Sequence, residues 1–246
     1  MRKGLRNFLA LIGLILVLFG AGFLVWGETP AQPMPEDLAA LQSDAQVTVT
    51  SGQSLVFTPV TSQPTTGFII YPDGQVGYRA YAPAAHQISA QGYLVVIMPM
   101  PLNLAIFGVN TAHDMQAAYP QIRHWAIGGH SLGGAMAATF AKTHPGAVQG
   151  LALWAAYPAS SDDLSNSELH VVSIFGSQDV LATGEKIEAS HQLLPVNTTW
   201  VQINGGNHGQ FGWYGDQAGD NPASISRSYQ QAQVVTTTLG MLEGLK

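Results

Sequence analysis

The sequence predicts a three-layer α/β domain with a mostly parallel central sheet, joined to an N-terminal transmembrane helix. Short apolar segments bounded by Gly or Pro alternate with segments of helical length, which is typical of this fold class. Of the 246 residues, 46% are hydrophobic and only 10% are charged, so the chain can form one sizeable core. A long uncharged apolar run near the N-terminus predicts the transmembrane helix.

The apolar run covers residues 8–26, FLALIGLILVLFGAGFLVW. As a helix it would be roughly 28 Å long, close to the thickness of one bilayer core. The basic residues within 1–7 favour a cytoplasmic N-terminus, which places the rest of the chain on the extracytoplasmic side. The alternative is a secretory signal cleaved near the TPA sequence at 29–31, which would release the protein. We expect an uncleaved membrane anchor.

Residues 27–45 contain three prolines and no apolar periodicity, which predicts a linker. Residues 46–246 are expected to form the folded domain, which opens with an antiparallel hairpin around Ser51 and Gly52. Continuous apolar runs are typical of parallel strands buried on both faces. Such strands are expected at residues 67–72, 93–99, 124–129, 150–158, 170–176 and 199–205.

Helices are expected between these strands and at the end of the domain. Their predicted ranges are 79–91, about 111–119, 132–143, 183–194 and about 224–245. This alternation implies right-handed crossovers. Only about a dozen residues follow the strand at 150–158 before the next one, so we expect no large lid domain and a fairly open site.

Composition and spacing exclude several classes of function. The net charge of −6 and the lack of a basic cluster after the N-terminus argue against nucleic acid as a partner. The chain has no cysteine, which excludes disulfides, cysteine metal sites and a thiol nucleophile. No pair of histidines has zinc-ligand spacing with a suitable carboxylate, so we expect no catalytic metal, and no cofactor is expected.

Residues 129–133, GHSLG, form a G-x-S-x-G motif between a predicted strand and a predicted helix. In this context the motif indicates a sharp turn that exposes the serine, and the flanking positions must be small to let the helix approach the strand. Ser131 is therefore the candidate nucleophile. The backbone N–H of Leu132 is a candidate oxyanion donor, since it points to the same place as the helix N-terminus.

A serine nucleophile needs a base, and the base needs an orienting carboxylate. Asp179 and His208 each follow a later predicted strand, so they should reach the same edge of the sheet as Ser131. Asp162 or Asp163 is the alternative acid. Their other roles would be turns or helix caps, and His130, beside the serine, is expected to be structural.

The second oxyanion donor should come from the loop after the strand at 67–72, where the backbone N–H groups near Asp73 and Gly74 are the candidates; an ordinary β-turn is the alternative. The apolar segment 98–108 should form one wall of the substrate pocket, with Met100 and Leu102 as candidate lining residues, unless it packs into the core. Phe211, shortly after His208, is a further candidate.

Together these motifs resemble the α/β-hydrolase family over residues 66–245, and within it the compact membrane-anchored hydrolases related to the dienelactone-hydrolase group. The resemblance implies an eight-stranded, mostly parallel sheet and carries a catalytic triad onto Ser131, Asp179 and His208. Two departures stand out. Pro72 and Asp73 occupy the place where most of the family has His-Gly, and the missing cysteine argues against the dienelactone hydrolase reaction itself.

The function expected from these residues is hydrolysis of a small carboxylic ester or related acyl compound through an acyl-enzyme intermediate. Thioesters, lactones and amides remain open as substrates, because one fold hosts many chemistries. The alternative is a membrane-tethered binding module that keeps the fold and a pocket without catalysis.

Overall fold

The computed structural model describes residues 3–245 and contains one eight-stranded sheet of order β1-β2-β4-β3-β5-β6-β7-β8. β1 and β2 pair antiparallel with their neighbours, and the strands from β4 to β8 run parallel. The strands are β1 (Val47–Ser51), β2 (Leu55–Pro59), β3 (Thr66–Tyr71), β4 (Leu94–Ile97), β5 (His124–His130), β6 (Gly150–Trp154), β7 (His170–Gly176) and β8 (Thr199–Ile203). This arrangement confirms the predicted fold class.

The central strands β3, β4 and β6 are buried along their whole length, as their continuous apolar sequences predict. The predicted strand at 150–158 ends earlier, at Trp154. Ala155 has φ 45°, in the left-handed region that breaks a strand. Strand ends were therefore less well predicted than strand positions.

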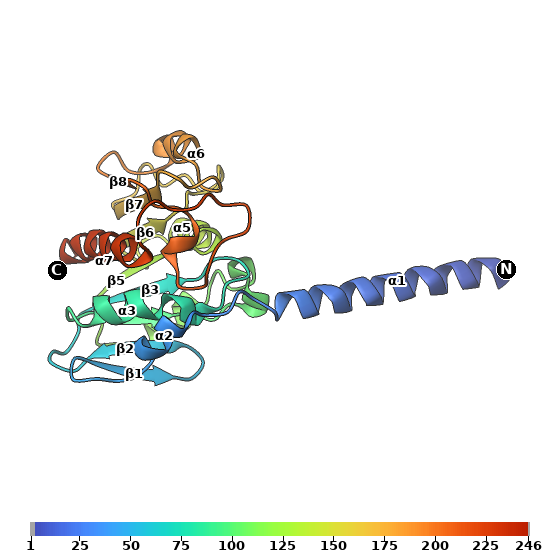
Figure 1. Cartoon of the computed structure of the whole chain (residues 1–246), viewed down its shortest axis with the longest axis horizontal. Helices are drawn as coiled ribbons and strands as arrows, with labels where there is room; N and C mark the ends of the chain where they lie inside the picture. Colours follow the sequence, from blue (N-terminus) through green and yellow to red (C-terminus); the bar gives the residue numbers. More distant parts are fainter. Residues whose placement is uncertain (1–2, 246) are drawn as a thin grey trace.

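Helices cover both faces of the sheet and give the domain its three layers (Figure 1). α3 (Ala82–Ser89) and α7 (Arg227–Glu243) contact each other over one face, where Phe68 and Trp154 are buried. α5 (Leu132–Thr143) covers the other face, where Trp125 and Phe140 are buried. The shorter helices are α2 (Pro35–Ala40), α4 (Ala112–Ala118) and α6 (Gly184–Ala189).

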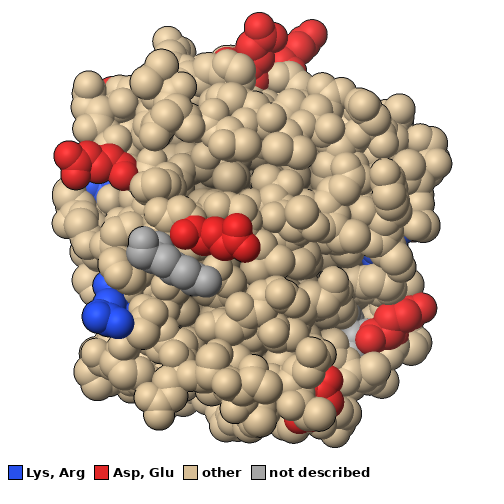
Figure 2. All heavy atoms as spheres, turned by 90° about the vertical axis from the view of Figure 1, so that its left-hand side faces the viewer, with Lys and Arg blue, Asp and Glu red and all other residues tan. Residues whose placement is uncertain are grey.

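The first helix, α1 (Lys3–Gly27), extends away from the domain, and the C-terminus lies at the opposite end (Figure 1). Residues 7–27 of this helix are long and apolar enough to cross a membrane or to act as a signal sequence. Residues 1 and 2 of the expected cytoplasmic segment lie outside the described residues. The end of the domain farthest from α1 carries scattered acidic side chains (Figure 2).

The segment after α1 crosses the domain surface in extended form and bonds to it. The Ala31 N–H donates to the Gln75 carbonyl at 2.8 Å, and the Met34 N–H donates to the Trp213 carbonyl at 2.8 Å. Gly77 in turn donates to the Ala31 carbonyl at 2.9 Å. These bonds hold residues 31–34 against two loops of the domain.

Close packing between β5, α5 and β3 depends on glycines. A Cβ built on Gly129 would lie 2.3 Å from the Tyr71 carbonyl oxygen, and one on Gly133 would lie 2.2 Å from the same atom. Both distances are far below van der Waals contact, and the atom that they meet is backbone. Only glycine at these two positions lets the helix start this close to the end of β3.

We expect Gly129→Ala to destabilise the fold by about 1–3 kcal/mol, the usual cost of overpacking a rigid site. Gly184→Ala is the matched control, because a Cβ there meets nothing within 4 Å, and its effect should stay within about 0.5 kcal/mol. Urea unfolding of the two variants and the wild type measures the difference. Equal stability of Gly129→Ala and Gly184→Ala would contradict the packing argument.

Candidate active site

Ser131 lies at the turn between β5 and α5 with φ 51° and ψ −118°. L-residues rarely adopt this conformation, so the turn stores strain that the surrounding structure must hold. The Ser131 N–H donates to the Trp154 carbonyl at 2.9 Å, which ties the turn to β6. The backbone thus forms the sharp strand-to-helix turn that the G-x-S-x-G motif predicts.

Asp179 and His208 form a buried hydrogen-bonded pair beside this turn. The Asp179 Oδ2 atom lies 2.8 Å from His208 Nδ1, and its Oδ1 accepts from the N–H groups of Leu181 and Ala182, both at 2.8 Å. His208 is 1% exposed and lines the same cavity as Ser131. A carboxylate fixed in this way holds the imidazole in one orientation, with Nε2 on the side of the ring away from Asp179.

The alternative acids lie elsewhere. The Asp162 Oδ2 atom accepts from the Thr139 hydroxyl of α5 at 2.5 Å. The exposed Asp163 accepts from the Ser165 N–H at 2.9 Å, a turn role. Neither carboxylate bonds to His208, so the structure brings Asp179 to the histidine and keeps the other two away from it.

The side chain of Asp73 occupies the centre of the site, whereas the sequence pointed only to the backbone N–H near this residue. Its Oδ1 accepts from the Leu132 N–H at 3.3 Å and from the Gly74 N–H at 2.6 Å. These are the two groups expected to bind an oxyanion. Its Oδ2 lies 3.7 Å from His208 Nε2. Asp73 therefore sits where the oxygen of a tetrahedral intermediate would bind.

Tyr81 bonds to the backbone of Asp73, and His130 contacts Tyr81. The Tyr81 hydroxyl accepts from the Asp73 N–H at 3.0 Å and lies 3.0 Å from His130 Nδ1. The buried His130 ring stacks on Phe211, with ring centroids 5.5 Å apart. The Asp73 N–H is thus already bonded, which leaves Gly74 to act with Leu132. These contacts support a structural role for His130.

The cavity at Ser131 has a volume of about 280 Å³. Its lining is mostly small and apolar: Ser131, Leu132, Ala135, Ala155, Ala156, Tyr157, Leu181, Ala182 and His208. The structure places the three expected pocket residues outside this cavity. Met100 and Phe211 are buried in the core, and Leu102 lies against Gly27 at the end of α1. A larger hollow of about 570 Å³ lies between Ala141 and Leu169 and contains none of the triad residues.

Comparison with known proteins identifies the family of this chain. The sequence model of the alpha/beta hydrolase family matches residues 67–232. The chain belongs to the α/β hydrolase family. The match covers more than half of the chain and includes Ser131, Asp179 and His208. No curated protein sequence matches the chain significantly.

Solved structures share the α/β hydrolase fold at low sequence identity. A dienelactone hydrolase from Anabaena variabilis superposes with a TM-score of 0.64 at 13% identity, covering 81% of this chain and 99% of its own. A dienelactone hydrolase-like promiscuous phosphotriesterase from metagenomic libraries gives 0.61 at 14% identity, with 82% and 99% covered. The esterase domain of a Rhodothermus marinus protein gives 0.60 at 15% identity, with 79% and 97% covered. At these identities the likeness shows the fold alone.

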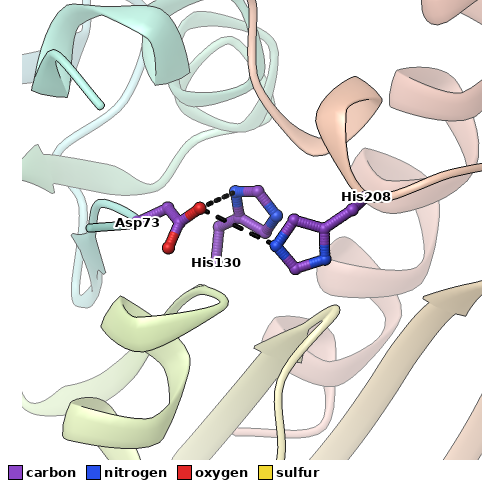
Figure 3. Close-up of side chains that lie close together, drawn as sticks. All are labelled: Asp73, His130 and His208. Carbon is purple, nitrogen blue, oxygen red and sulfur yellow. Dashed lines mark ion pairs between the residues drawn. The ribbon is translucent and has the colours of Figure 1, made fainter. Parts of the chain in front are cut away.

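Within this α/β hydrolase, Asp73, His130 and His208 also form a group with the right atoms for a metal. One ligand atom of each lies within 4.8 Å of the others, the one such group among residues 3–245 (Figure 3). Spacing along the chain did not reveal it, since the three residues follow different strands. Each already has other partners: Tyr81 faces His130 Nδ1, Asp179 bonds to His208, and two N–H groups bond to Asp73. We therefore interpret the group as a polar network in which Asp73 pairs with His208 and His130 contacts Tyr81.

Two carboxylates flank His208 and control its protonation. Burial disfavours the imidazolium, but Asp179 and Asp73 outweigh burial and raise the pKa of His208 to about 9. Burial also acts on the carboxyls of Asp73 and Asp179, yet the hydrogen bond and charge of His208 lower the pKa of both. Burial lowers the pKa of His130 to about 3, so that ring stays neutral. At neutral pH the site holds one imidazolium between two carboxylates.

This pairing also links stability to pH. The folded-state pKa of His208, about 9, lies above its unfolded value of about 6.5. The contribution of the imidazolium to stability is therefore complete below about pH 6.5 and is lost as the pH rises through about 9. The His208 imidazolium thus stabilises the folded site, and it must lose its proton before His208 can act as a base.

We expect Asp73→Asn to lower the pKa of His208, because the amide keeps the shape and the acceptor oxygen but removes one of the two flanking charges. NMR titration of protein with ¹⁵N-labelled histidine measures it directly, with His208→Gln to assign the resonance. Asp163→Asn, an exposed and distant carboxylate, is the control and should leave the pKa of His208 unchanged. An identical His208 titration in Asp73→Asn and the wild type would show that Asp73 does not act on the base.

Proposed function

We propose that this α/β hydrolase is a serine hydrolase that cleaves a carboxylic ester or related acyl bond through a Ser131-His208-Asp179 triad. The observation that carries the proposal is the 2.8 Å bond between Asp179 and His208 beside the strained turn at Ser131. The three residues follow the carboxyl ends of three strands; Ser131 and His208 line one cavity, and Asp179 bonds to His208 Nδ1. This is the arrangement that acyl transfer to water requires.

In the proposed reaction, Ser131 Oγ attacks the acyl carbon while His208 Nε2 takes the hydroxyl proton. The carbonyl oxygen becomes an oxyanion held by the N–H groups of Leu132 and Gly74. His208 then gives the proton to the leaving alcohol, and an acyl-enzyme remains. Water, deprotonated by His208, attacks this ester, and Ser131 recovers its proton as the acid leaves. Asp179 stabilises the imidazolium at each stage without taking its proton.

Substrate must displace Asp73 before this reaction can begin. The Asp73 carboxylate uses the two N–H groups that the carbonyl oxygen needs, and it holds His208 in the protonated form. When the side chain rotates away, both donors become free and the histidine loses one of its flanking charges. The resting site is therefore a closed form, and the reaction is expected to be faster above the pKa of His208.

The size and lining of the cavity indicate a substrate of modest size. A volume of about 280 Å³ with mostly alanine and leucine walls suits a short acyl or alkyl group. Thioesters, lactones and amides present the same electrophilic carbon and are tested beside esters.

We also propose that α1 is an uncleaved membrane anchor. Its apolar length supports a span, and the basic residues in the first seven positions favour a cytoplasmic N-terminus with the hydrolase domain outside. The bonds from residues 31–34 to the domain support a short, fixed connection between the span and the fold.

A second candidate function is a membrane-tethered binding module without catalysis. The observation that favours it is Asp73, whose carboxylate fills the oxyanion position with a negative charge. If Asp73 never moves, the Ser131 hydroxyl cannot be activated, and the fold retains only its cavity.

The two functions separate in one experiment on the full chain. We expect a fluorophosphonate probe to label the wild type covalently, with an adduct that is not hydrolysed. The hydrolysis rates of a series of p-nitrophenyl esters should show a preferred acyl length. Ser131→Ala should lose labelling and about 10⁴-fold or more of the esterase rate. Asp73→Asn should react faster than the wild type at pH 7. A folded wild type and a folded Asp73→Asn that both fail to label would exclude the triad and leave the binding module.

The identity of the acid is tested separately. We expect Asp179→Asn to lower kcat by about 10⁴-fold, because the histidine loses the partner that fixes its tautomer. Asp163→Asn, which removes an exposed carboxylate from a turn, should leave kcat within about twofold, the range of a neutral surface change. Equal rates for both variants would remove Asp179 from the triad.

A further inference from the structure

The end of α1 is fixed to the edge of the sheet that carries Ser131, which we term the catalytic edge. The Gly27 carbonyl accepts from Asn103 Nδ2 at 2.9 Å and from Gln75 Nε2 at 3.4 Å. Gly27 is buried, and a Cβ built on it would lie 2.9 Å from the Leu102 Cβ. The loop after β4, residues 98–111, therefore contacts the last turn of the helix through Leu102 and Asn103.

This 98–111 loop presents apolar side chains to the outside. It contains no charged residue, and its adjacent Ile106 and Phe107 are 48% and 52% exposed. Both belong to the short 3-10 helix η3 (Ala105–Phe107), which follows η2 (Pro101–Asn103). Two large adjacent apolar side chains left in water are costly, so such a surface indicates a partner that covers them.

The residue types at the end of α1 and in the loop are those found at the membrane interface. Three residues separate Phe107 from Asn103, which bonds to the end of α1, so the exposed side chains follow closely on the contact with the helix. The polar headgroup layer on each side of a bilayer is roughly 5–8 Å deep. Trp26, 49% exposed in the last turn of α1, is a residue type that favours the same layer.

The opposite end of the domain has a different character. Acidic side chains are scattered over the face turned away from α1 (Figure 2). Val60 and Val196, also exposed, lie at the ends of loops on the opposite edge of the sheet from Ser131. Only the catalytic edge combines an anchor helix with an uncharged apolar loop.

We infer that Ile106 and Phe107 rest in the membrane–water interface, that the catalytic edge faces the bilayer, and that the substrate is an acyl ester that partitions into the membrane. This inference rests on the proposed anchor and hydrolase function. The surface binds lipid, and its contact is apolar, with no basic residue in the loop to select an acidic headgroup.

The 98–111 loop is also part of the wall behind the oxyanion donors. A Cβ on Gly74 would lie 3.5 Å from Leu104 Cδ2, so Leu104 of the loop packs against this donor residue. An ester held at the interface by this loop approaches the edge of the sheet that carries Ser131 and need not cross the acidic far face. The surface and the reaction site are thus neighbours on one edge of the sheet.

The first test measures membrane depth and does not depend on catalysis. The chain has no cysteine, so single variants Ile106→Cys, Phe107→Cys, Val60→Cys and Val196→Cys can each carry one nitroxide label in the full chain. The protein is placed in vesicles of phosphatidylcholine and phosphatidylglycerol, and spin-label accessibility to oxygen and to a water-soluble nickel chelate is compared. We expect labels at 106 and 107 to favour oxygen, and labels at 60 and 196 to favour nickel.

Two results would overturn the inference. Labels at 106 and 107 that behave like those at 60 and 196 would place the loop in water. Labels at 106 and 107 that are shielded from both reagents would show a protein contact, from a second copy or another membrane protein, in place of lipid.

The second test concerns the substrate. We expect Phe107→Asp to lower hydrolysis of a long-chain ester carried in the same vesicles by roughly tenfold, because the charge disfavours burial at the interface. Hydrolysis of a short water-soluble ester should be unchanged, and Val196→Asp should leave both rates unchanged. Equal loss on both esters would contradict a membrane substrate. A wild type that hydrolyses neither ester would overturn the proposed function. The spin-label measurement would still test whether Ile106 and Phe107 contact the membrane.

Discussion

The close approach of the turn at Ser131 to the end of β3 is the constraint on which the rest of the site depends. Because Gly129 and Gly133 both lie against the Tyr71 carbonyl, α5 can begin directly beside the loop that follows β3. That approach brings the Leu132 N–H and the Gly74 N–H to one acceptor. A side chain at either glycine would separate the two donors. The spacing of small residues in the motif is thus a requirement for the oxyanion site as well as for the nucleophile.

The second constraint is electrostatic. A buried imidazolium is unfavourable alone, and two carboxylates on opposite sides of the His208 ring make it the stable form. In the proposed reaction Asp179 stabilises the imidazolium at every stage, whereas Asp73 stabilises only the state without substrate. The Asp73 carboxylate also satisfies the N–H groups of Gly74 and Leu132. Under that proposal Asp73 stabilises the resting site and lowers its reactivity.

Much of the fold was predictable because buried parallel strands leave continuous apolar runs, and Gly or Pro marks their ends. The order of Ser131, Asp179 and His208 along three such strands could be read in the same way, since strand ends converge on one edge. The role of Asp73 could not. Its side chain direction depends on the bond between its own N–H and Tyr81 and on the packing of Gly74 against Leu104, which are contacts between loops. Met100 and Leu102 have the composition of a pocket wall, yet one fills the core and the other meets Gly27.

The segment between α1 and the domain joins the N-terminal apolar helix to both sides of the site. Ala31 bonds to Gln75, one residue from the Gly74 donor, and Met34 bonds to Trp213, in the loop that follows His208. Gln75 has φ 58° and also bonds to Leu102 and Asn103, so the oxyanion loop is held in a strained form between the segment and the 98–111 loop. A fragment that begins after residue 36 would lose the bonds from Ala31 and Met34 and the contact of Gln75 with the Gly27 carbonyl, and would keep those of Gln75 with Leu102 and Asn103. The segment after α1 is therefore one of the two supports of the loop that holds Gly74.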